Sequence, residues 1–362
     1  MANPTPTTTP APKSTPSYAP RRRPLSPLAT APILVPVALA VLGAFALGSH
    51  FGDSRAAQPT ESFLAEIAAR PGAAGGRILF ADSTGIRELR LADGKKYPLA
   101  LRAPNGRPMR SPALSPDGSR LVWIEESGAL EAAVMQLELG AADRKPAEVS
   151  RAAAVGPVAF SSDGLAFAFA ARDGAPGTGG GIVVVGAKGA IRKLAAGRAE
   201  VGPSAAMPPS FSPDGGQIAF TGREGTVEVV DASTGAPTAH FAGVDPMFID
   251  ATSIGFEWGG LRYRAAFPAE VDPRTHLIAA REFEHAISRE RRRSPLAYSR
   301  AGDLAAFVRP TGRRHTFPPG EGADGEILEL CVLDVPTARI VTLESDFACS
   351  GAISLAAATA QP

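Results

Sequence analysis

The chain has 362 residues, of which 37 are basic, 36 are acidic and 44% are apolar, so its formal charge is close to neutral. This length allows one large or two small domains with a real core, and the apolar content excludes a wholly disordered chain. Residues 1–31 contain four basic residues and no acid, which leaves a slightly acidic remainder of 33 basic and 36 acidic residues. Because binding to nucleic acid requires a concentrated positive field, we expect no nucleic-acid partner.

The N-terminal region changes abruptly in composition. Residues 1–30 are rich in proline and threonine and have almost no apolar side chains to bury, so we predict a disordered tail. Residues 24–52 then contain no charged side chain, and their most apolar part, residues 31–51, is long enough for one transmembrane helix. A cleaved signal peptide is the alternative, with Ala44 and Ala46 as the small residues of a cleavage site.

The charges on either side of the apolar segment predict its orientation. Arg21, Arg22 and Arg23 precede it, and Asp53 is the first charged residue after it. Because positive charges are retained on the cytoplasmic side, this order places the N-terminus in the cytoplasm. Everything after residue 52 is then expected outside the cytoplasm.

Residues 52–76 are predicted to form a stem. Within it, Phe63, Leu64 and Ile67 have helical spacing, and Thr60 is suited to cap the start of a helix. We therefore expect a short helix over residues 59–70 that packs its apolar side on the following domain or on the membrane. Binding of a partner by this helix is the alternative.

A repeated turn is the most informative feature of the sequence. Ser-Pro-Asp-Gly or Ser-Ser-Asp-Gly precedes a short apolar strand at residues 115–118, 161–164 and 212–215. Proline presets the backbone, aspartate accepts hydrogen bonds from nearby groups, and glycine adopts the left-handed conformation that closes the turn. The repeated turn residues are Asp117, Gly118, Asp163, Gly164, Asp214 and Gly215. Successive aspartates are 46 and 51 residues apart, a period typical of propeller blades.

The repeats extend over most of the chain. A degenerate copy at residues 299–303 lies about two periods after the third, so we predict an all-β fold, a β-propeller over residues 77–356 with six blades. Five or seven blades are the alternatives, because residues 241–295 are irregular. Residues 348–355 have the pattern of a first blade strand, and we expect them to close the first blade. Residues 357–362 are predicted to be a disordered tail.

The repeat resembles the WD-like repeats of TolB-type propellers, in which the turn and its apolar strand are followed by an alternating strand and an Asp-x-x-Thr-Gly turn. Residues 227–235 contain this second part. The resemblance implies a propeller of the bacterial envelope, but it implies little about function, because the repeat residues build turns rather than sites. TolB-type proteins have an α/β domain where this chain has its apolar segment, so their role is not carried over.

The sequence contains no motif that predicts catalysis. The Gly-x-Ser-x-Gly motif of α/β-hydrolases is absent, and the chain has only two asparagines that could help to hold a metal in a propeller channel. None of the five histidines pairs with another ligand at a zinc spacing. We therefore predict no catalytic, metal-binding or cofactor-binding residue, and we expect that the protein is not an enzyme.

Three groups of residues are candidates for other roles. Cys331 and Cys349 lie in the closing region, where an oxidising compartment would favour a disulfide; two small buried side chains are the alternative. The irregular stretch 244–258 is a predicted docking surface or else the core of a divergent blade. The basic cluster 289–293 would bind an acidic partner or lipid headgroups, unless it is a solvated loop. The predicted partner-binding residues are Met247, Phe248, Phe256, Trp258, Arg291, Arg292 and Arg293.

Together these features predict a protein of the bacterial inner membrane, with a cytoplasmic N-terminus and a propeller in the periplasm or outside the cell. We expect the propeller to bind a protein partner, as a scaffold or an accessory subunit of an envelope or membrane complex. A propeller hydrolase or lyase with a divalent metal in its channel is the alternative function.

Overall fold

The computed structural model describes residues 60–68, 76–82, 85–101, 107–128, 131–141, 143, 145–174, 178–201, 207–268, 280–282, 296–298, 303–315, 325–347 and 353–356. The chain divides into two units, Met1–Ala57 and Gln58–Pro362, and all the described residues lie in the second unit. The described residues form one helix, α2 (Thr60–Ala68), and five sheets.

Four of these sheets have four antiparallel strands each. The first sheet contains β24 (Ser354–Ala356), β1 (Arg77–Asp82), β2 (Gly85–Arg90) and β3 (Lys96–Leu101). The second contains β4 (Met109–Leu114), β5 (Arg120–Gly128), β6 (Glu131–Glu138) and β7 (Ala147–Ala152). The fourth contains β16 (Val244–Asp250), β17 (Ser253–Trp258), β18 (Leu261–Ala266) and β19 (Ala280–Glu282). The fifth contains β20 (Leu296–Tyr298), β21 (Leu304–His315), β22 (Gly325–Asp334) and β23 (Arg339–Phe347).

The third sheet is larger and has eight strands. They are β8 (Ala154–Phe160), β9 (Phe167–Arg172), β10 (Gly180–Val185), β11 (Ile191–Ala199), β12 (Ser210–Phe211), β13 (Gln217–Gly222), β14 (Thr226–Asp231) and β15 (Pro237–Ala242). The first four and the last four strands are separate antiparallel meanders, and they meet through one register pair, Ala199 with Gly222.

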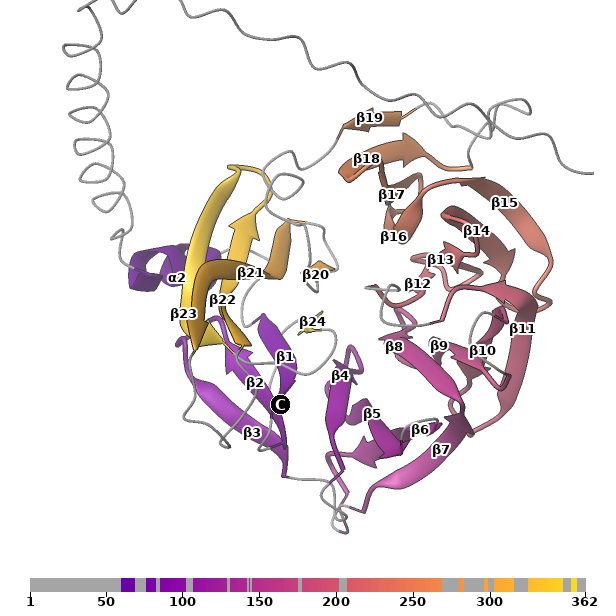
Figure 1. The fold of residues 1–362 in the computed structure, drawn as a ribbon, viewed down its shortest axis with the longest axis horizontal. Helices are drawn as coiled ribbons and strands as arrows, with labels where there is room; N and C mark the ends of the chain where they lie inside the picture. The colour runs from indigo at the N-terminus through magenta and orange to yellow at the C-terminus, as the bar shows by residue number, and fades with distance from the viewer. Residues whose placement is uncertain are drawn as a thin grey trace, which may run out of the picture. The chain divides into compact units, whose positions relative to one another are not determined.

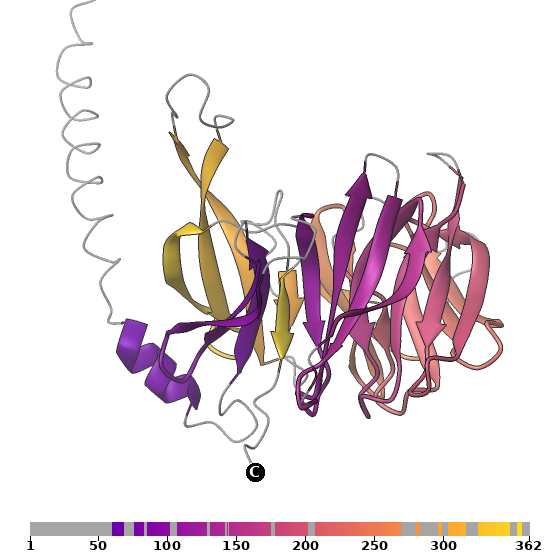
Figure 2. The same cartoon turned by 90° about the horizontal axis from the view of Figure 1, so that it is seen from below.

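Within this unit the sheets stand around a common axis. The strands β24, β4, β8, β12 and β20 lie nearest the centre, and β3, β7, β11 and β15 lie at the periphery (Figure 1). In the side view the strands run roughly along this axis (Figure 2). The fold is therefore a β-propeller, and it confirms the all-β prediction.

The core lies between neighbouring sheets. In β5, the side chains of Leu121 and Trp123 pack with Leu79 of the first sheet, and Val122 on the opposite face packs with Phe169 of the third. All five side chains are fully buried. Because both faces of such a strand are covered, its sequence is a continuous apolar run rather than an alternating one.

The last described strand closes the first sheet. β24 is antiparallel to β1, with Ile78 opposite Leu355 and Leu79 opposite Ser354. This pairing confirms that the C-terminal region completes a blade begun near the N-terminal end of the propeller. The hydroxyl of Ser354 also donates to the carbonyl of Pro112 in the second sheet, at 2.8 Å.

The predicted stem helix is also confirmed. α2 has nine residues, and its side chains Phe63, Leu64 and Ile67 are buried in the core of the propeller, with exposed fractions of 1%, 6% and 0%. Of the two packing surfaces expected for its apolar side, the structure therefore places α2 on the following domain.

The predicted transmembrane segment, residues 31–51, and the two predicted tails lie outside the described residues. Among the residues that are described, no helix combines the length and the apolarity needed to cross a bilayer. The membrane anchor and the number of blades stay predictions.

Candidate functional site

Three of the innermost strands share an irregularity. The pairing of β4 with β5 skips Ser111–Pro112, that of β8 with β9 skips Gly156–Pro157, and that of β16 with β17 skips Asp245–Pro246. Ser111 and Asp245 have φ values of 50° and 51°, which is unusual for residues with a side chain. Such bulges change the direction of an inner strand beside the axis, and proline suits them because it has no N–H to pair.

This bulge is a second repeated element, which the turn motif alone does not predict. The sequence does contain a signal for it. A proline comes three or four residues before the first residue of the next turn, as Pro112 does before Ser115 and Pro246 before Asp250. The inner strands of three sheets therefore have a bulge at equivalent positions.

The predicted repeat turns have one common geometry. The serine hydroxyl donates to the aspartate two residues later, at 2.5 Å for Asp117, 2.6 Å for Asp163 and 2.5 Å for Asp214. The glycines that follow have φ values between 71° and 74°, and their N–H groups donate to the serine carbonyls. These residues are therefore used within their own turns, as the sequence motif predicts.

The turns of neighbouring meanders also contact one another. The hydroxyl of Ser162 donates to the carbonyl of Pro213 at 2.6 Å. A Cβ atom placed on Gly164 would lie 3.2 Å from the ring of Pro116, so this glycine allows close contact with the second sheet. The repeat turns thus form a connected rim and have a structural role.

The hydrogen bonds to Asp117 lead us to expect a measurable dependence of stability on pH. The hydroxyls of Ser115 and then Ser119 donate to its carboxylate and lower its pKa from 3.8 to about 2. A carboxyl with a lower pKa in the folded state stabilises the fold above pH 4, and this contribution is lost as the pH falls towards 2. We expect Asp117→Asn to flatten the fall of the urea midpoint between pH 4 and pH 2. An unchanged slope would contradict this assignment.

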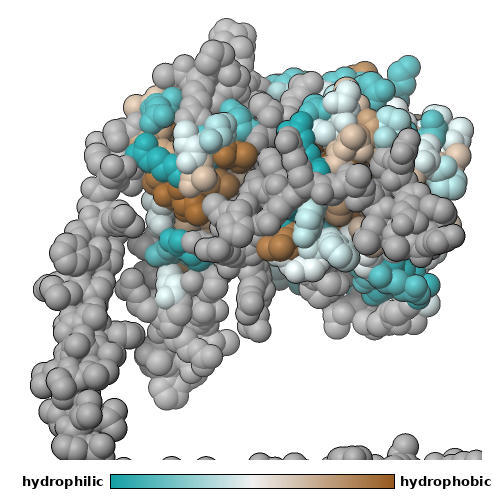
Figure 3. Space-filling model, turned by 90° about the horizontal axis from the view of Figure 1, so that it is seen from above, coloured by the Kyte–Doolittle hydropathy of each residue, from teal (hydrophilic) through white to brown (hydrophobic). Residues whose placement is uncertain are grey.

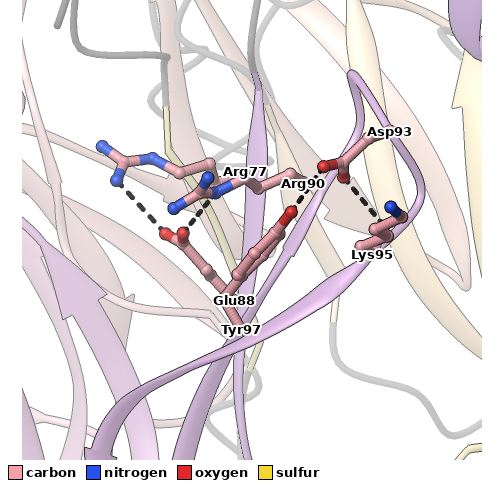
Figure 4. A network of polar contacts seen from close by, with 6 residues as sticks. All are labelled: Arg77, Glu88, Arg90, Asp93, Lys95 and Tyr97. Carbon is pink, nitrogen blue, oxygen red and sulfur yellow. Dashed lines mark hydrogen bonds and ion pairs between the residues drawn. The ribbon is translucent and has the colours of Figure 1, made fainter.

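A polar network in the first sheet contains a buried carboxylate (Figure 4). Glu88 is fully buried, and its oxygens lie 3.2 Å from Arg77 Nη1 and 2.6 Å from Arg90 Nε. The Arg90 guanidinium also lies 3.9 Å from the centre of the Tyr97 ring, and the Tyr97 hydroxyl donates to Asp93 and lowers the pKa of that carboxyl. The charges compensate one another, which is typical of a structural network.

For residues 244–258 the sequence left two interpretations, a docking surface or the core of a divergent blade, and the positions of Phe248 and Phe256 agree with the second. Residues 244–258 form the hairpin β16–β17 of the fourth sheet, although its register shifts between Val244 and Met247 and again between Phe248 and Asp250, so this stretch is part of a blade. Phe248 and Phe256 are 9% and 4% exposed and belong to the core between the third and fourth sheets. Met247 is partly buried and packs towards the fifth sheet. These three side chains therefore have structural roles, since aromatic and sulfur side chains pack blade cores as readily as interfaces.

Trp258, in contrast, is 47% exposed. It ends β17 beside a two-residue turn of Gly259 and Gly260, whose φ values of 59° and 80° suit a tight hairpin. A side chain at either glycine would meet nothing within 4 Å, so the space beside the turn is open. The indole is the largest apolar group among the exposed side chains of the described residues.

An aromatic ladder supports Trp258 from below. Its ring centre lies 6.0 Å from that of Tyr263, which is 5.9 Å from Phe256, which is in turn 5.1 Å from Phe241. Phe241 is fully buried. The exposed indole is therefore connected to the core through rings in contact, and its position on the hairpin is well defined.

Other predicted site residues are only partly described. The side chain of Cys331 is buried in β22, with its Sγ 3.7 Å from the Thr342 hydroxyl. Cys349 lies outside the described residues, so the disulfide stays a prediction. Arg291, Arg292 and Arg293 also lie outside them. On the face drawn in Figure 3, the described apolar residues occur in separate groups among polar ones.

No group of three or more His, Cys, Asp or Glu side chains suited to a metal ion is found within the described part of the chain. Among these side chains, His240 lies with its Nδ1 2.8 Å from Glu228, which also pairs with Arg198. This cluster connects β11, β14 and β15 and is consistent with a structural role.

Comparisons with known proteins agree with the fold. No protein-family model matches the chain, and no curated protein matches it in sequence. Among solved structures, TolB from Acinetobacter baumannii is similar with 13% identity and a TM-score of 0.52, over 82% of this chain and 70% of that one. A TolB-like protein from Agrobacterium tumefaciens has 15% identity and a TM-score of 0.46, over 76% and 91%. The propeller of Cps50 (Swd1) from Myceliophteria thermophila has 14% identity and a TM-score of 0.44, over 78% and 89%. The fold of this chain is that of a TolB-like β-propeller.

Proposed function

We propose that this chain is a membrane-anchored propeller that binds a protein partner outside the cytoplasm, as a scaffold or accessory subunit. In this proposal the propeller has six blades, since the third sheet consists of two four-stranded meanders joined by one register pair. The apolar segment at residues 31–51 supports the anchor. The protein carries out no catalytic step.

Trp258 is the observation that carries the protein-binding role. Interfaces depend on a few large anchors, and tryptophan is the residue type most enriched among them. A side chain that is already held in place loses little conformational freedom when it binds. The exposed indole, its supporting aromatic ladder and the open space beside Gly259 and Gly260 provide these conditions.

The test compares Trp258→Ala with Ile191→Ala. Both wild-type side chains are 47% exposed, so the second variant controls for the loss of an exposed apolar side chain. We expect tagged full-length protein, purified in mild detergent, to retain a partner at fixed stoichiometry. Trp258→Ala should weaken its affinity about 30-fold, because an anchor contributes at least about 2 kcal/mol. Ile191→Ala should retain wild-type affinity.

Two outcomes would contradict the proposal. A protein that purifies alone, with a stoichiometric divalent metal, would favour the metal-dependent enzyme. If Trp258→Ala binds the partner with the same affinity as Ile191→Ala, Trp258 is not part of the partner site. Extraction of the membranes at alkaline pH tests the anchor separately, since an integral protein stays in the membrane pellet.

A further inference from the structure

α2 is too short to be stable by itself. An isolated helix of its nine residues is marginal in water, so its stability depends on what its apolar side contacts. Phe63, Leu64 and Ile67 are all buried, whereas Ala65 and Glu66 on the other side are exposed. The helix is therefore held by its packing on the propeller.

That packing involves two sheets from opposite ends of the propeller sequence. The three side chains belong to one core cluster, which also includes Ile78 and Leu91 from the first sheet and its turn. The same cluster includes Val308 and Leu330 from the fifth sheet. In both views α2 lies beside these two sheets at the outer side of the ring (Figures 1 and 2). α2 thus covers the place where the first and last sheets meet.

Further contacts join α2 to the fifth sheet on one side and to the first sheet on the other. Arg339, at the start of β23, lies 4.9 Å from the centre of the Phe63 ring and 3.3 Å from the carboxylate of Glu66. On the side of the first sheet, a Cβ atom on Gly94 would lie 3.4 Å from Leu64 Cδ1, so the turn between β2 and β3 packs directly against the helix.

Other contacts also close the ring, since Ile78 and Phe80 of the first sheet share the core cluster with Leu304 and Val332 of the fifth. β24 contributes three register pairs to β1, whereas β2 contributes six. An ion pair between Lys96 of β3 and Glu344 of β23 adds a contact at the periphery. Because an exposed ion pair adds little stability, we expect the buried side of α2 to contribute more to holding these sheets together than the pair of Lys96 and Glu344 does.

We propose that α2 is a closing helix, whose docking on the first and fifth sheets is coupled to the pairing of β24 with β1 that closes the propeller ring. With α2 in place, the first and fifth sheets share one covered core and β24 stays paired with β1. When α2 leaves, this core is exposed to water and the three pairs of β24 open more often. The inference does not depend on the identity of a partner or on Trp258.

Hydrogen exchange of the full-length protein tests this coupling. We compare Ile67→Asp, which places a charge in the shared core, with Ala65→Asp, which places the same charge on the exposed side of α2. In Ile67→Asp, amides of residues 77–82 and 353–356 should exchange at least about tenfold faster. Amides of β9 and β10 in the third sheet should keep their wild-type rates. In Ala65→Asp, all of these rates should stay at the wild-type level.

Two results would overturn the proposal. If Ile67→Asp accelerates exchange equally in all sheets, α2 contributes only to global stability; if it changes no rate, α2 contributes nothing to closure. Should Ile67→Asp fail to fold, Ile67→Ala gives the same comparison with a smaller disturbance. The reverse experiment uses Ser354→Pro, which disrupts the pairing of β24: because coupling is reciprocal, amides of residues 60–68 should then exchange faster.

Discussion

Replacing Trp123 by alanine is expected to lower the free energy of unfolding by about 3–5 kcal/mol, the usual cost of removing a large aromatic side chain from a core. Trp123 is the largest of the fully buried side chains described, and it packs between the first and second sheets. Its Nε1 donates to Glu125 Oε1 at 3.0 Å, so the substitution also removes the donor from a buried carboxylate. Urea unfolding followed by circular dichroism measures the change.

Trp123→Phe separates the two contributions. It keeps most of the buried ring but removes the N–H, so we expect a smaller loss of about 1–3 kcal/mol from the unsatisfied acceptor. If both variants unfold at the wild-type urea concentration, the second sheet does not pack on the first as described. Circular dichroism is preferable to fluorescence here, since the chain has only two tryptophans.

Gly243→Ala should destabilise the protein by about 2–5 kcal/mol, because it combines backbone strain with overpacking. Gly243 lies between β15 and β16, has a φ of 141°, and donates its N–H to the carbonyl of Gly225 at 2.9 Å. An added Cβ would lie 2.6 Å from the Phe256 ring and 3.1 Å from the Glu257 carbonyl. The connection between the third and fourth sheets would have to shift.

Gly225→Ala is the matched control for this substitution. Gly225 also has a positive φ, of 74°, but an added Cβ would meet nothing within 4 Å. We expect it to cost about 1–2 kcal/mol, the strain of a left-handed residue alone. Equal urea midpoints for the two variants would show that the close contact of the added Cβ atom with Phe256 does not change the free energy of unfolding.

The fold could be predicted from the sequence because its signals are local. A turn of Ser, Asp and Gly has only a few favourable conformations, and its recurrence at a blade-like period indicates repeated hairpins. The closing strand could also be predicted, since a propeller with an open edge would expose unpaired backbone groups. The short helix followed from the spacing of Phe63, Leu64 and Ile67.

The candidate site was harder to predict, because the exposure of a residue depends both on the face of its strand and on how close it lies to the end of that strand. The aromatic residues of 244–258 have the composition of an interface, but Phe248 and Phe256 lie on the core side of their strands. Trp258 differs from them because it ends its strand beside a glycine turn. The bulges at Ser111 and Asp245 were missed, since a proline in a short apolar strand is not a distinctive signal by itself.

The pairing of β24 with β1 joins two segments that are synthesised at very different times. Residues 77–82 leave the ribosome long before their neighbour at residues 354–356 is made, because the two segments are far apart in the sequence. At about 5–20 residues per second, the edge of β1 therefore remains without this neighbour for tens of seconds. During that interval the edge of β1 that later pairs with β24 exposes unpaired backbone groups, and such an edge can pair with another chain.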